Sequence, residues 1–585
     1  MKNFLTLSHN LRNWLLAKGG IWVADNTIRD YRPALFFVLC IFSYFAFLIK
    51  TQPDWVLSGE MWAEMATNYY PIASDSSLFV KLFATDAGYI PLPQRLIALI
   101  GNLLHLPAAN VSYFYTWSAM FATGSMVGVI CLKPFRNLIR NDFFRLLIAA
   151  AVLLIADFES RTFINFTYFA GFTAAIVTAL AFVNKSDDVP RWAWFIPVLL
   201  TSKPAVLAAL PAMIAVAIVS RPRFRRITLT VTILCVAQVI RMLFSNSEGV
   251  FVQANDFSAV AKLNAAIRYF IGFLGAFSVG KGVTQSFYLP TLYGILLLFI
   301  CLLTVFRKRD NSGALILVGL ALLFFNTLLN CFALSDSWNL NLERLNGAPL
   351  YRHIIVGYFG VTLVIAGLIA SGATKSLSNK FSFFFGLDIG PLVFFLWFVI
   401  SGWFSFVQTV NTQPEFPVIF NSQWQSMAHI IDSDRDICVP VDPYGWIFQR
   451  NCLLLNPTIK DIFRGPSLSF KTLESDAGHG GLLLDDIPPQ PQSNLISLAL
   501  LIRPNSARQI FVHAKAILKT TNGADKYLIG SRHLAVTGGL VTLWGRDATP
   551  LREIESITLQ FSNPINLAYS NTELGNKPVV IWLGN

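Results

Sequence analysis

Long apolar runs constrain this chain more than any other feature of its sequence. Nine of them lie before residue 410, at 34–49, 109–131, 143–156, 166–183, 227–244, 290–306, 313–334, 354–371 and 389–409. About 20 apolar residues in a helix can cross the roughly 30 Å hydrocarbon core of a bilayer. Asp, Glu, Lys and Arg together make up only 13% of the chain, and the mean hydropathy is +0.54. The sequence therefore predicts a polytopic α-helical membrane protein and excludes disordered, collagen-like and nucleic-acid-binding chains.

The stretch 192–219 is longer than one ordinary span and is interrupted by Ser202-Lys203-Pro204. Proline breaks a helix, so we expect two helices joined by a turn at this point. Counting this helical hairpin as two passes, together with the nine runs, gives about 11 membrane passes. The basic loops KPFRNLIR, RPRFRR and FRKR then all face the cytoplasm, as the positive-inside rule requires.

Composition divides the chain into three parts. Residues 1–33 form a basic cytoplasmic segment, and 34–410 form the membrane domain with outside loops at 50–108 and 245–289. From residue 411 onward there are 14 Lys+Arg against 15 Asp+Glu, whereas 31 against 18 precede it. The basic excess thus belongs to the membrane half, where it indicates topology and contact with anionic lipids. The tail 411–585 contains runs typical of strands and is predicted to be an outside β-rich domain; the runs are LISLALLI, QIFVHAKAIL, VTLWG, SITLQF and VVIWLG.

Two of the seven cysteines, Cys438 and Cys452, lie close together in a polar region. A disulfide between them would require an oxidising compartment, which agrees with an outside tail. The other five cysteines lie in or beside apolar runs and are expected to be buried thiols.

Carboxylates gather in the first outside loop. Glu60 and Glu64 are four residues apart, so on a helix they would share one face. Asp86 lies further along the same loop. A carboxylate beside a low-dielectric boundary has a raised proton affinity, which suits a general base. The alternative is the solvated acidic face of an interfacial helix.

A second acidic point, Asp157 and Glu159, lies at the outer end of the 143–156 run beside Arg161. Charges at a membrane boundary are costly and often functional. An ion pair that only fixes helix packing is the alternative.

Four outside cations are candidates for binding a lipid phosphate. Arginine offers phosphate a planar bidentate fork and lysine a point charge. The alternative for each is snorkelling to ordinary phospholipid. The four are Arg95, Lys203, Arg344 and Arg352. Nucleotide-binding and common hydrolase motifs are absent from the sequence, which disfavours nucleotide-driven transport and nucleotide-sugar chemistry.

The layout resembles the C-type integral-membrane glycosyltransferases (GT-C), and within them the phage and enterobacterial serotype-converting O-antigen glucosyltransferases. The features that carry the resemblance are GEMWAE in the first loop, the GYIPLPQRLIA segment, the TSKP-broken hairpin, the LYRHIIV start of a late run and the outside C-terminal domain. The resemblance implies a GT-C-like fold in a bacterial inner membrane with the C-terminal domain in the periplasm. It implies transfer of glucose from a polyprenyl-phosphate donor to lipopolysaccharide O-antigen or another cell-surface glycan.

The mechanism we expect from this resemblance is an inverting displacement. Glu60 or Glu64, which correspond to the family's essential first-loop acid, would remove the proton of the acceptor hydroxyl. The polyprenyl phosphate would leave, stabilised by Lys203, Arg95 and Arg344 or Arg352. No cofactor is implied, although the number of carboxylates leaves metal use open. Expected partners are membrane lipids and a synthase and a flippase for the lipid-linked sugar; nucleic acid is not among them.

Two other classes remain open. An O-antigen polymerase or ligase would also act on glycans at the periplasmic face, but would use a polyprenyl-diphosphate glycan. A secondary transporter or lipid flippase would share the many spans, but it often shows inverted repeats, which we do not find, and rarely needs a large outside domain.

Overall fold

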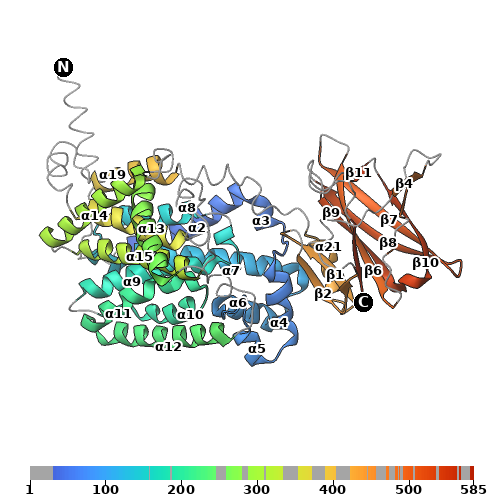
Figure 1. Cartoon of the computed structure of the whole chain (residues 1–585), viewed down its shortest axis with the longest axis horizontal. Helices are drawn as coiled ribbons and strands as arrows, with labels where there is room; N and C mark the ends of the chain where they lie inside the picture. The colour runs from blue at the N-terminus through green and yellow to red at the C-terminus, as the bar shows by residue number, and fades with distance from the viewer. Residues whose placement is uncertain are drawn as a thin grey trace, which may run out of the picture. The chain divides into compact units, whose positions relative to one another are not determined.

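The chain folds into two compact units in the computed structural model (Figure 1). The helical unit comprises the described residues of 1–51, 77–97 and 116–416, and the β-rich unit those of 52–76, 98–115 and 417–585. The structure describes residues 31–156, 159–184, 188–244, 258–279, 288–308, 311–333, 354–371, 389–403, 422–443, 446–455, 470–473, 481–484, 487, 492–504, 508–534, 539–562, 565–567 and 580–585.

The helical unit is built from α-helices joined by short 3-10 and π segments. The α-helices that lie wholly or partly in it are α2 (Arg32–Thr51), α5 (Leu78–Phe83), α6 (Leu92–Leu103), α7 (Ala108–Gly128), α8 (Asp142–Ile155), α9 (Ala170–Val183), α10 (Ile196–Leu200), α11 (Leu210–Val219), α12 (Pro222–Phe244), α13 (Ala259–Val279), α14 (Tyr288–Lys308), α15 (Gly313–Ala333), α17 (Ile355–Ala370) and α19 (Ile389–Trp397). The shorter segments are η2 (Val129–Cys131), η3 (Lys133–Asn137), η4 (Glu159–Arg161), η5 (Phe166–Phe169), η6 (Arg191–Phe195), η7 (Pro204–Ala209) and η10 (Phe398–Trp403).

Six helices in the described part of the chain are long and apolar enough to cross a membrane. They are Arg32–Thr51, Ala108–Cys131, Phe166–Val183, Ala259–Val279, Tyr288–Arg307 and Gly313–Phe332. Of the described helices, four more are apolar but have only 10–17 residues. This composition supports the predicted membrane association. Five of the six helices coincide with predicted apolar runs. The sixth, Ala259–Val279, lies within the predicted outside loop 245–289, so the expectation of a loop there is wrong for these residues.

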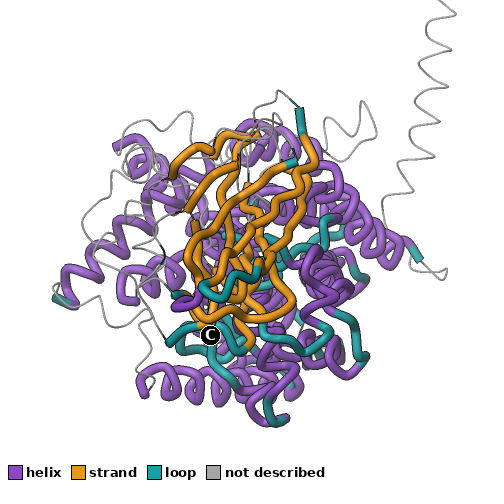
Figure 2. Tube along the Cα trace, turned by 90° about the vertical axis from the view of Figure 1, so that its right-hand side faces the viewer, coloured by secondary structure: helices purple, strands orange, loops and turns teal. Residues whose placement is uncertain are grey.

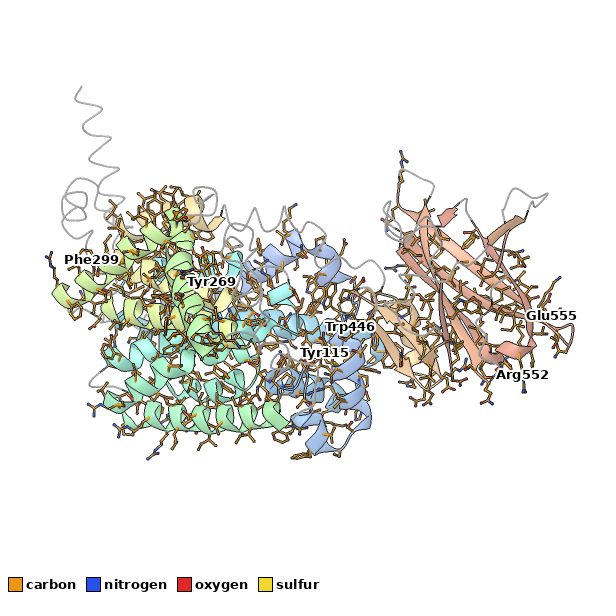
Figure 3. All side chains as sticks on the ribbon, viewed as in Figure 1. Tyr115, Tyr269, Phe299, Trp446, Arg552 and Glu555 are labelled. Atoms are coloured by element: carbon orange, nitrogen blue, oxygen red, sulfur yellow. A yellow bond between two sulfur atoms is a disulfide. The ribbon has the colours of Figure 1, made fainter. Side chains whose placement is uncertain are left out.

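The helices differ in how much of their surface other helices cover. In Phe166–Val183, 89% of the residues are buried, so this helix lies inside the unit, whereas only 17% of the most apolar 18 residues of Tyr288–Arg307 are buried. Phe299 projects from the outer side of α14 (Figure 3). Helices α15 and α17 pack closest at Gly319 and Gly360, where a Cβ on either residue would lie 2.5 Å from the other's carbonyl oxygen. Small residues allow membrane helices to approach in this way.

The stretch 191–219 forms the predicted helical hairpin, whose limbs are η6 with α10 and η7 with α11. Asp188, before the first limb, accepts the backbone N–H of Arg223 at the start of α12, at 2.8 Å. Gln238, about 22 Å further along α12, donates to the carbonyl of Ser202 at 2.7 Å. The first limb therefore runs along α12 and the second returns. Pro204 causes the break, because it lacks an N–H and holds Lys203 in extended backbone (φ −54, ψ 131).

The β-rich unit contains one ten-stranded antiparallel sheet and one two-stranded hairpin (Figure 2). The strand order of the large sheet is β3-β12-β6-β9-β8-β7-β10-β5-β4, and β11 pairs with β6. The strands are β1 (Ile437–Val441), β2 (Trp446–Arg450), β3 (Leu453–Leu454), β4 (Phe470–Leu473), β5 (Gly481–Leu484), β6 (Asn494–Pro504), β7 (Ile510–Thr520), β8 (Asp525–Leu534), β9 (Gly539–Pro550), β10 (Ile554–Phe561), β11 (Ile565–Leu567) and β12 (Val580–Gly584), with the short η11 (Leu551–Glu553) between β9 and β10. The β-rich domain and all five quoted strand-like runs are thus confirmed.

Both faces of the large sheet carry apolar cores near β12. Val580 and Trp582 point to one core, while Ile581 and Leu583 point to the other, as the two-residue period of a strand requires. The second core includes Cys438 and Cys452, which form a disulfide with their Cα atoms 5.9 Å apart. The disulfide closes the β1–β2 hairpin, which covers this face.

Two parts of the predicted first outside loop belong to the β-rich unit rather than to the membrane domain. They contribute α3 (Pro53–Leu57), η1 (Met65–Tyr69), α4 (Tyr70–Asp75) and the segment 98–115. The sequence prediction placed the domain boundary at 411, whereas the unit's last segment begins at Pro417 with α21 (Trp424–Ile431).

Candidate functional site

The tip of the helical hairpin carries Lys203, half-buried in the turn before η7. Its ammonium Nζ lies 4.8 Å from the ring centroid of Tyr89, within the range of a cation–π contact. Tyr89 is buried, and its hydroxyl donates to Oδ2 of Asp86 at 3.4 Å. One aromatic ring thus connects a cation to a buried carboxylate.

A tight turn presents Asp86 and Tyr89 to the hairpin tip. Ala87 and Gly88 both have positive φ (+45 and +85), and Asp86 and Tyr89 pair through their backbones as in a two-residue reverse turn. Three residues later the backbone N–H of Leu92 donates to the carbonyl of Thr201 at 3.0 Å. The turn and the hairpin tip are therefore joined directly.

Gln238 on α12 ties the same two segments together. Its Nε2 donates to the carbonyl of Ser202, and its Oε1 accepts the backbone N–H of Ile90 at 3.2 Å. Gln238 is 2% exposed, so it satisfies two backbone groups that would otherwise be buried without partners. We call Asp86, Tyr89, Arg95, Lys203 and Gln238 the hairpin-tip cluster.

Arg95 is buried, and its guanidinium group donates to backbone carbonyls. Its Nε donates to the carbonyl of Ala84 at 3.2 Å and its Nη2 to that of Thr85 at 3.4 Å. The planar guanidinium fork thereby fixes the chain just before Asp86. In this structure Arg95 positions the turn.

The cluster brings together three predicted site residues that are far apart in the sequence, namely Asp86, Arg95 and Lys203. Sequence reasoning missed Tyr89 and Gln238. Gln238 gave a usable signal, because it is an uncharged polar residue within the apolar run 227–244. Tyr89 lies in the quoted GYIPLPQRLIA segment, but nothing in the sequence indicated a role for its side chain.

Glu60 lies in the β-rich unit and makes contacts that link distant parts of it. Its Oε2 accepts the hydroxyl of Ser422 at 2.6 Å and the backbone N–H groups of Trp424 and Gln425 at 2.8 and 3.4 Å. These N–H groups are the first of α21, which have no partner within the helix. Glu60 therefore caps α21 from more than 360 residues away.

Burial raises the pKa of Glu60 to about 7. The hydrogen bond from Ser422, the positive charge of Arg532 and the two backbone N–H groups act in the opposite direction. Burial also lowers the pKa of Arg532, while the carboxylates of Glu60 and Asp442 raise it. A carboxylate with this proton affinity can gain or lose a proton near neutral pH.

The expectation that Glu60 and Glu64 share a helix face is wrong. Helix α3 ends at Leu57, and Gly59 (φ +69) and Ala63 (φ +44) have left-handed backbone that no α-helix continues through. The backbone N–H of Ala63 also donates to the carbonyl of Asp442, which holds this segment as a loop. Glu64 instead stands directly before η1, half-buried.

Of the second acidic point, the structure describes Glu159, which follows the end of α8 by four residues. Arg161 donates from Nη2 to the carbonyls of Leu153 and Leu154 in the last turn of α8, at 3.0 Å each. Glu159 begins η4, and its backbone carbonyl accepts the hydroxyl of Thr162 at 2.8 Å. The remaining predicted site residues, Asp157, Arg344 and Arg352, lie outside the described residues, as do most of the segment 1–33 and much of the loop 245–289.

Within the described ranges, three or more His, Cys, Asp or Glu side chains nowhere form a group that could hold a metal ion. Comparisons with known proteins find no family model that matches the chain and no curated protein that matches it.

Proposed function

We propose that this protein is a membrane glycosyltransferase of GT-C type that binds the phosphate of a polyprenyl-phosphate sugar at the hairpin-tip cluster. The observation that carries the proposal is the contact of Lys203 with Tyr89, whose hydroxyl binds Asp86. The cluster thus contains a cation for the leaving phosphate and a carboxylate for the acceptor proton, the two kinds of group that a displacement at a sugar–phosphate bond uses.

The location of Lys203 supports a binding role. It is half-buried at a helix break in an apolar helical unit, where a charged side chain is costly and is a functional candidate by default. Broken helices in membrane proteins commonly line binding sites. Arg95 and Gln238 act as positioning residues: they hold the turn at Asp86 and the hairpin tip against each other.

In the proposed step the acceptor hydroxyl oxygen attacks the anomeric carbon and forms the new glycosidic bond. The bond from that carbon to the phosphate oxygen breaks, and the phosphate keeps the electron pair. Asp86 takes the hydroxyl proton, and Lys203 stabilises the negative charge that develops on the phosphate. This route inverts the configuration at the anomeric carbon.

Glu60 and Glu64, the acids that the resemblance favours, remain candidates for the base. The cap that Glu60 provides to α21 engages only Oε2, and its pKa of about 7 suits proton transfer. Glu159 is a weaker candidate, because Arg161, two residues further on, binds the carbonyls at the end of α8.

The proposal includes the topology and partners expected from the sequence. The chain crosses a bacterial inner membrane in about 11 passes, with its N-terminus in the cytoplasm and the β-rich unit in the periplasm. Glucose passes to lipopolysaccharide O-antigen or another surface glycan. A separate synthase and a flippase supply the lipid-linked sugar. Five of the six candidate spans coincide with passes of this arrangement, and the disulfide between Cys438 and Cys452 agrees with an oxidising compartment for the β-rich unit.

A transfer assay tests the proposal. Purified full-length protein is mixed with polyprenyl-phosphate glucose and isolated lipopolysaccharide, and hexose addition is followed by product mass. The variants are Lys203→Gln, Asp86→Asn, Glu60→Gln and Glu64→Gln. The matched control is Lys50→Gln, which removes an exposed lysine at the end of α2.

We expect wild type and Lys50→Gln to add hexose and Lys203→Gln to lose at least about 100-fold in rate, as loss of a charge-stabilising donor typically costs. The carboxylate whose neutral amide abolishes transfer is the base. Absence of hexose addition by wild type, or full activity of Lys203→Gln, would overturn the proposal. Transfer only from a polyprenyl-diphosphate glycan would identify a polymerase or ligase instead.

A further inference from the structure

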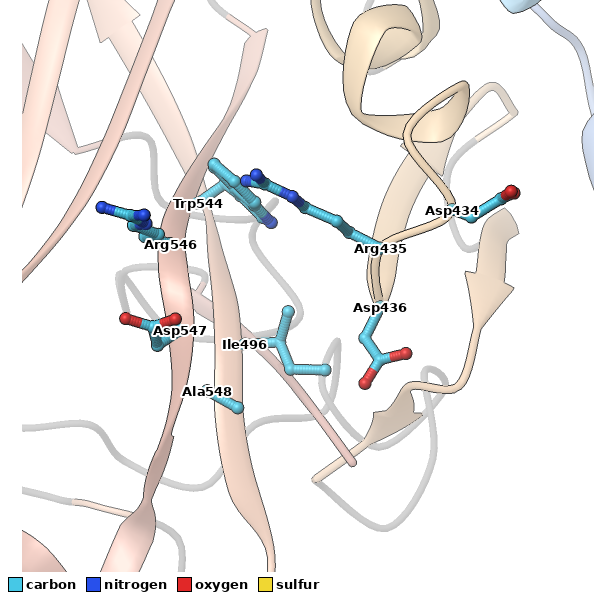
Figure 4. Close-up of a pocket in the computed structure, with 9 residues that line it drawn as sticks. Asp434, Arg435, Asp436, Ile496, Trp544, Arg546, Asp547 and Ala548 are labelled. Atoms are coloured by element: carbon cyan, nitrogen blue, oxygen red, sulfur yellow. The ribbon is translucent and has the colours of Figure 1, made fainter.

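A polar pocket of about 460 Å³ opens within the β-rich unit (Figure 4). One wall is the loop Asp434–Asp436, between α21 and β1. The other wall is formed by Ile496 on β6 and by Trp544–Ala548 on β9. The volume lies within the range of about 300–1,000 Å³ that small-molecule sites occupy. None of these residues belongs to the hairpin-tip cluster.

An irregularity in the sheet creates the second wall. Ser497 pairs with Trp544 and Leu495 with Thr549, so the four residues Gly545–Ala548 stand opposite the single residue Ile496. Bulges of this kind re-aim side chains and are common beside functional sites. Here the excursion of β9 leaves a recess next to Trp544.

The side chains facing the recess combine an aromatic ring with a donor and an acceptor. The guanidinium carbon of Arg435 lies 5.8 Å from the ring centroid of Trp544. Asp436 faces the recess from the same loop as Arg435 (Figure 4). Its Oδ1 accepts the side-chain amide of Asn451 at 3.0 Å and its Oδ2 that of Asn585 at 3.2 Å. These amides fix the carboxylate, and each oxygen keeps a further lone pair for a ligand.

The charges around the pocket balance. Asp434 is paired with Arg450 at 3.4 Å, and in Figure 4 it points away from the recess. The remaining charged residues are two carboxylates, Asp436 and Asp547, and two guanidinium groups, Arg435 and Arg546. A balanced set disfavours a strongly charged ligand, because either sign would meet repulsion as well as attraction.

We infer that this pocket binds a neutral carbohydrate. A sugar ring has an apolar C–H face that packs on an aromatic surface, here the half-buried ring of Trp544. Its hydroxyls both donate and accept, so one can donate to Asp436 while its neighbour accepts from Arg435. The inference does not depend on the proposed transferase activity, since all of these residues lie in the β-rich unit.

Binding of lipid-free glycans to the full-length protein in nanodiscs tests the inference. The probes are a printed array of neutral and acidic oligosaccharides and delipidated O-polysaccharide, with affinities then measured for the glycans bound. The variants are Trp544→Ala and Arg435→Gln. The matched controls are Tyr527→Ala and Lys515→Gln, a second cation–aromatic pair on the same sheet, with Nζ 4.0 Å from the ring centroid and outside the pocket.

We expect wild type and both controls to bind the same neutral glycans, and both pocket variants to lose at least about tenfold in affinity. Arg435 is exposed, so Arg435→Gln remains informative even if Trp544→Ala fails to fold. The inference is overturned if wild type binds no glycan or only acidic ones, or if Arg435→Gln binds as wild type does. Since no donor lipid is present, loss of binding is distinguishable from loss of transfer.

Discussion

The carboxylate of Glu60 accepts the backbone N–H of Trp424 at 2.8 Å, across 364 positions of sequence. Nearby, Nε2 of Gln425 donates to the carbonyl of Gly59 at 2.6 Å, and Nε1 of Trp424 donates to the carbonyl of Ala108 at 2.7 Å. Helix α21 is therefore the element on which the three separate segments of the β-rich unit meet.

Replacing Glu60 should destabilise this junction. Glu60→Ala removes the acceptor for Ser422 and for two N–H groups of α21, and we expect a loss of about 1–3 kcal/mol in the free energy of unfolding. Glu60→Gln keeps an acceptor oxygen, so its free energy of unfolding should fall less than that of Glu60→Ala. Thermal unfolding of the purified protein measures both. Glu555→Gln, an exposed glutamate in the same unit, is the control (Figure 3). Equal stability of Glu60→Ala and wild type would contradict the capping role.

The raised pKa of Glu60 predicts a pH dependence of stability. Burial raises this pKa from 4.5 to about 7. Between these values the folded chain keeps a proton that the unfolded chain has released, so the free energy of unfolding falls as the pH rises through this window. The contribution is complete below pH 4.5 and lost above about pH 7, at about 1.4 kcal/mol per unit of pKa difference. Between these pH values the unfolding midpoint of wild type should fall more steeply with rising pH than that of Glu60→Gln. Parallel dependences on pH would refute the raised pKa of Glu60.

The disulfide between Cys438 and Cys452 should contribute measurably to the stability of the β-rich unit. Cys438 and Cys452 are 14 positions apart, and closing a loop of this length stabilises a fold by about 3 kcal/mol. We expect reductant to lower the unfolding midpoint of wild type and to leave the double variant Cys438→Ser, Cys452→Ser unchanged. Quantitative thiol labelling of the unfolded, unreduced protein should detect the five remaining cysteines. Seven labelled thiols would show that the bond does not form.

Gln238 should matter for activity without touching the ligand. Gln238→Leu leaves the carbonyl of Ser202 and the N–H of Ile90 without their shared partner. The hairpin tip and the turn at Asp86 are then no longer held in position against each other. We expect transfer to fall about tenfold or more, with the donor concentration for half-maximal rate raised. Arg241→Gln, an exposed change on the same helix, should retain the wild-type rate. A rate for Gln238→Leu equal to that control would exclude this positioning role.

Local sequence patterns predicted local structure well. Apolar length predicted five of the six candidate spans, the proline at 204 predicted the hairpin, and β-rich apolar runs predicted strands such as β6 and β12. Apolar length missed the sixth span, Ala259–Val279, because Lys262 and Arg268 interrupt its apolar run. The connection of Asp86 to Lys203 through Tyr89 could not be predicted, because it depends on tertiary contacts such as those of Gln238. The environment of Glu60 could not be predicted either, because the chain has left-handed backbone at Gly59 and Ala63 where a helix was expected. Contacts between distant segments leave no periodic trace in a sequence.

The division of the β-rich unit into three segments also affects the timing of biosynthesis. At about 5–20 residues per second, roughly 20–70 s pass between synthesis of Glu60 and of its partner Trp424. During this interval the early segment emerges without the helix it caps. The unit therefore completes its fold late in translation, and a fragment beginning at Pro417 lacks both early segments. The isolated tail 417–585, if expressed alone, would therefore lack residues that complete its own fold.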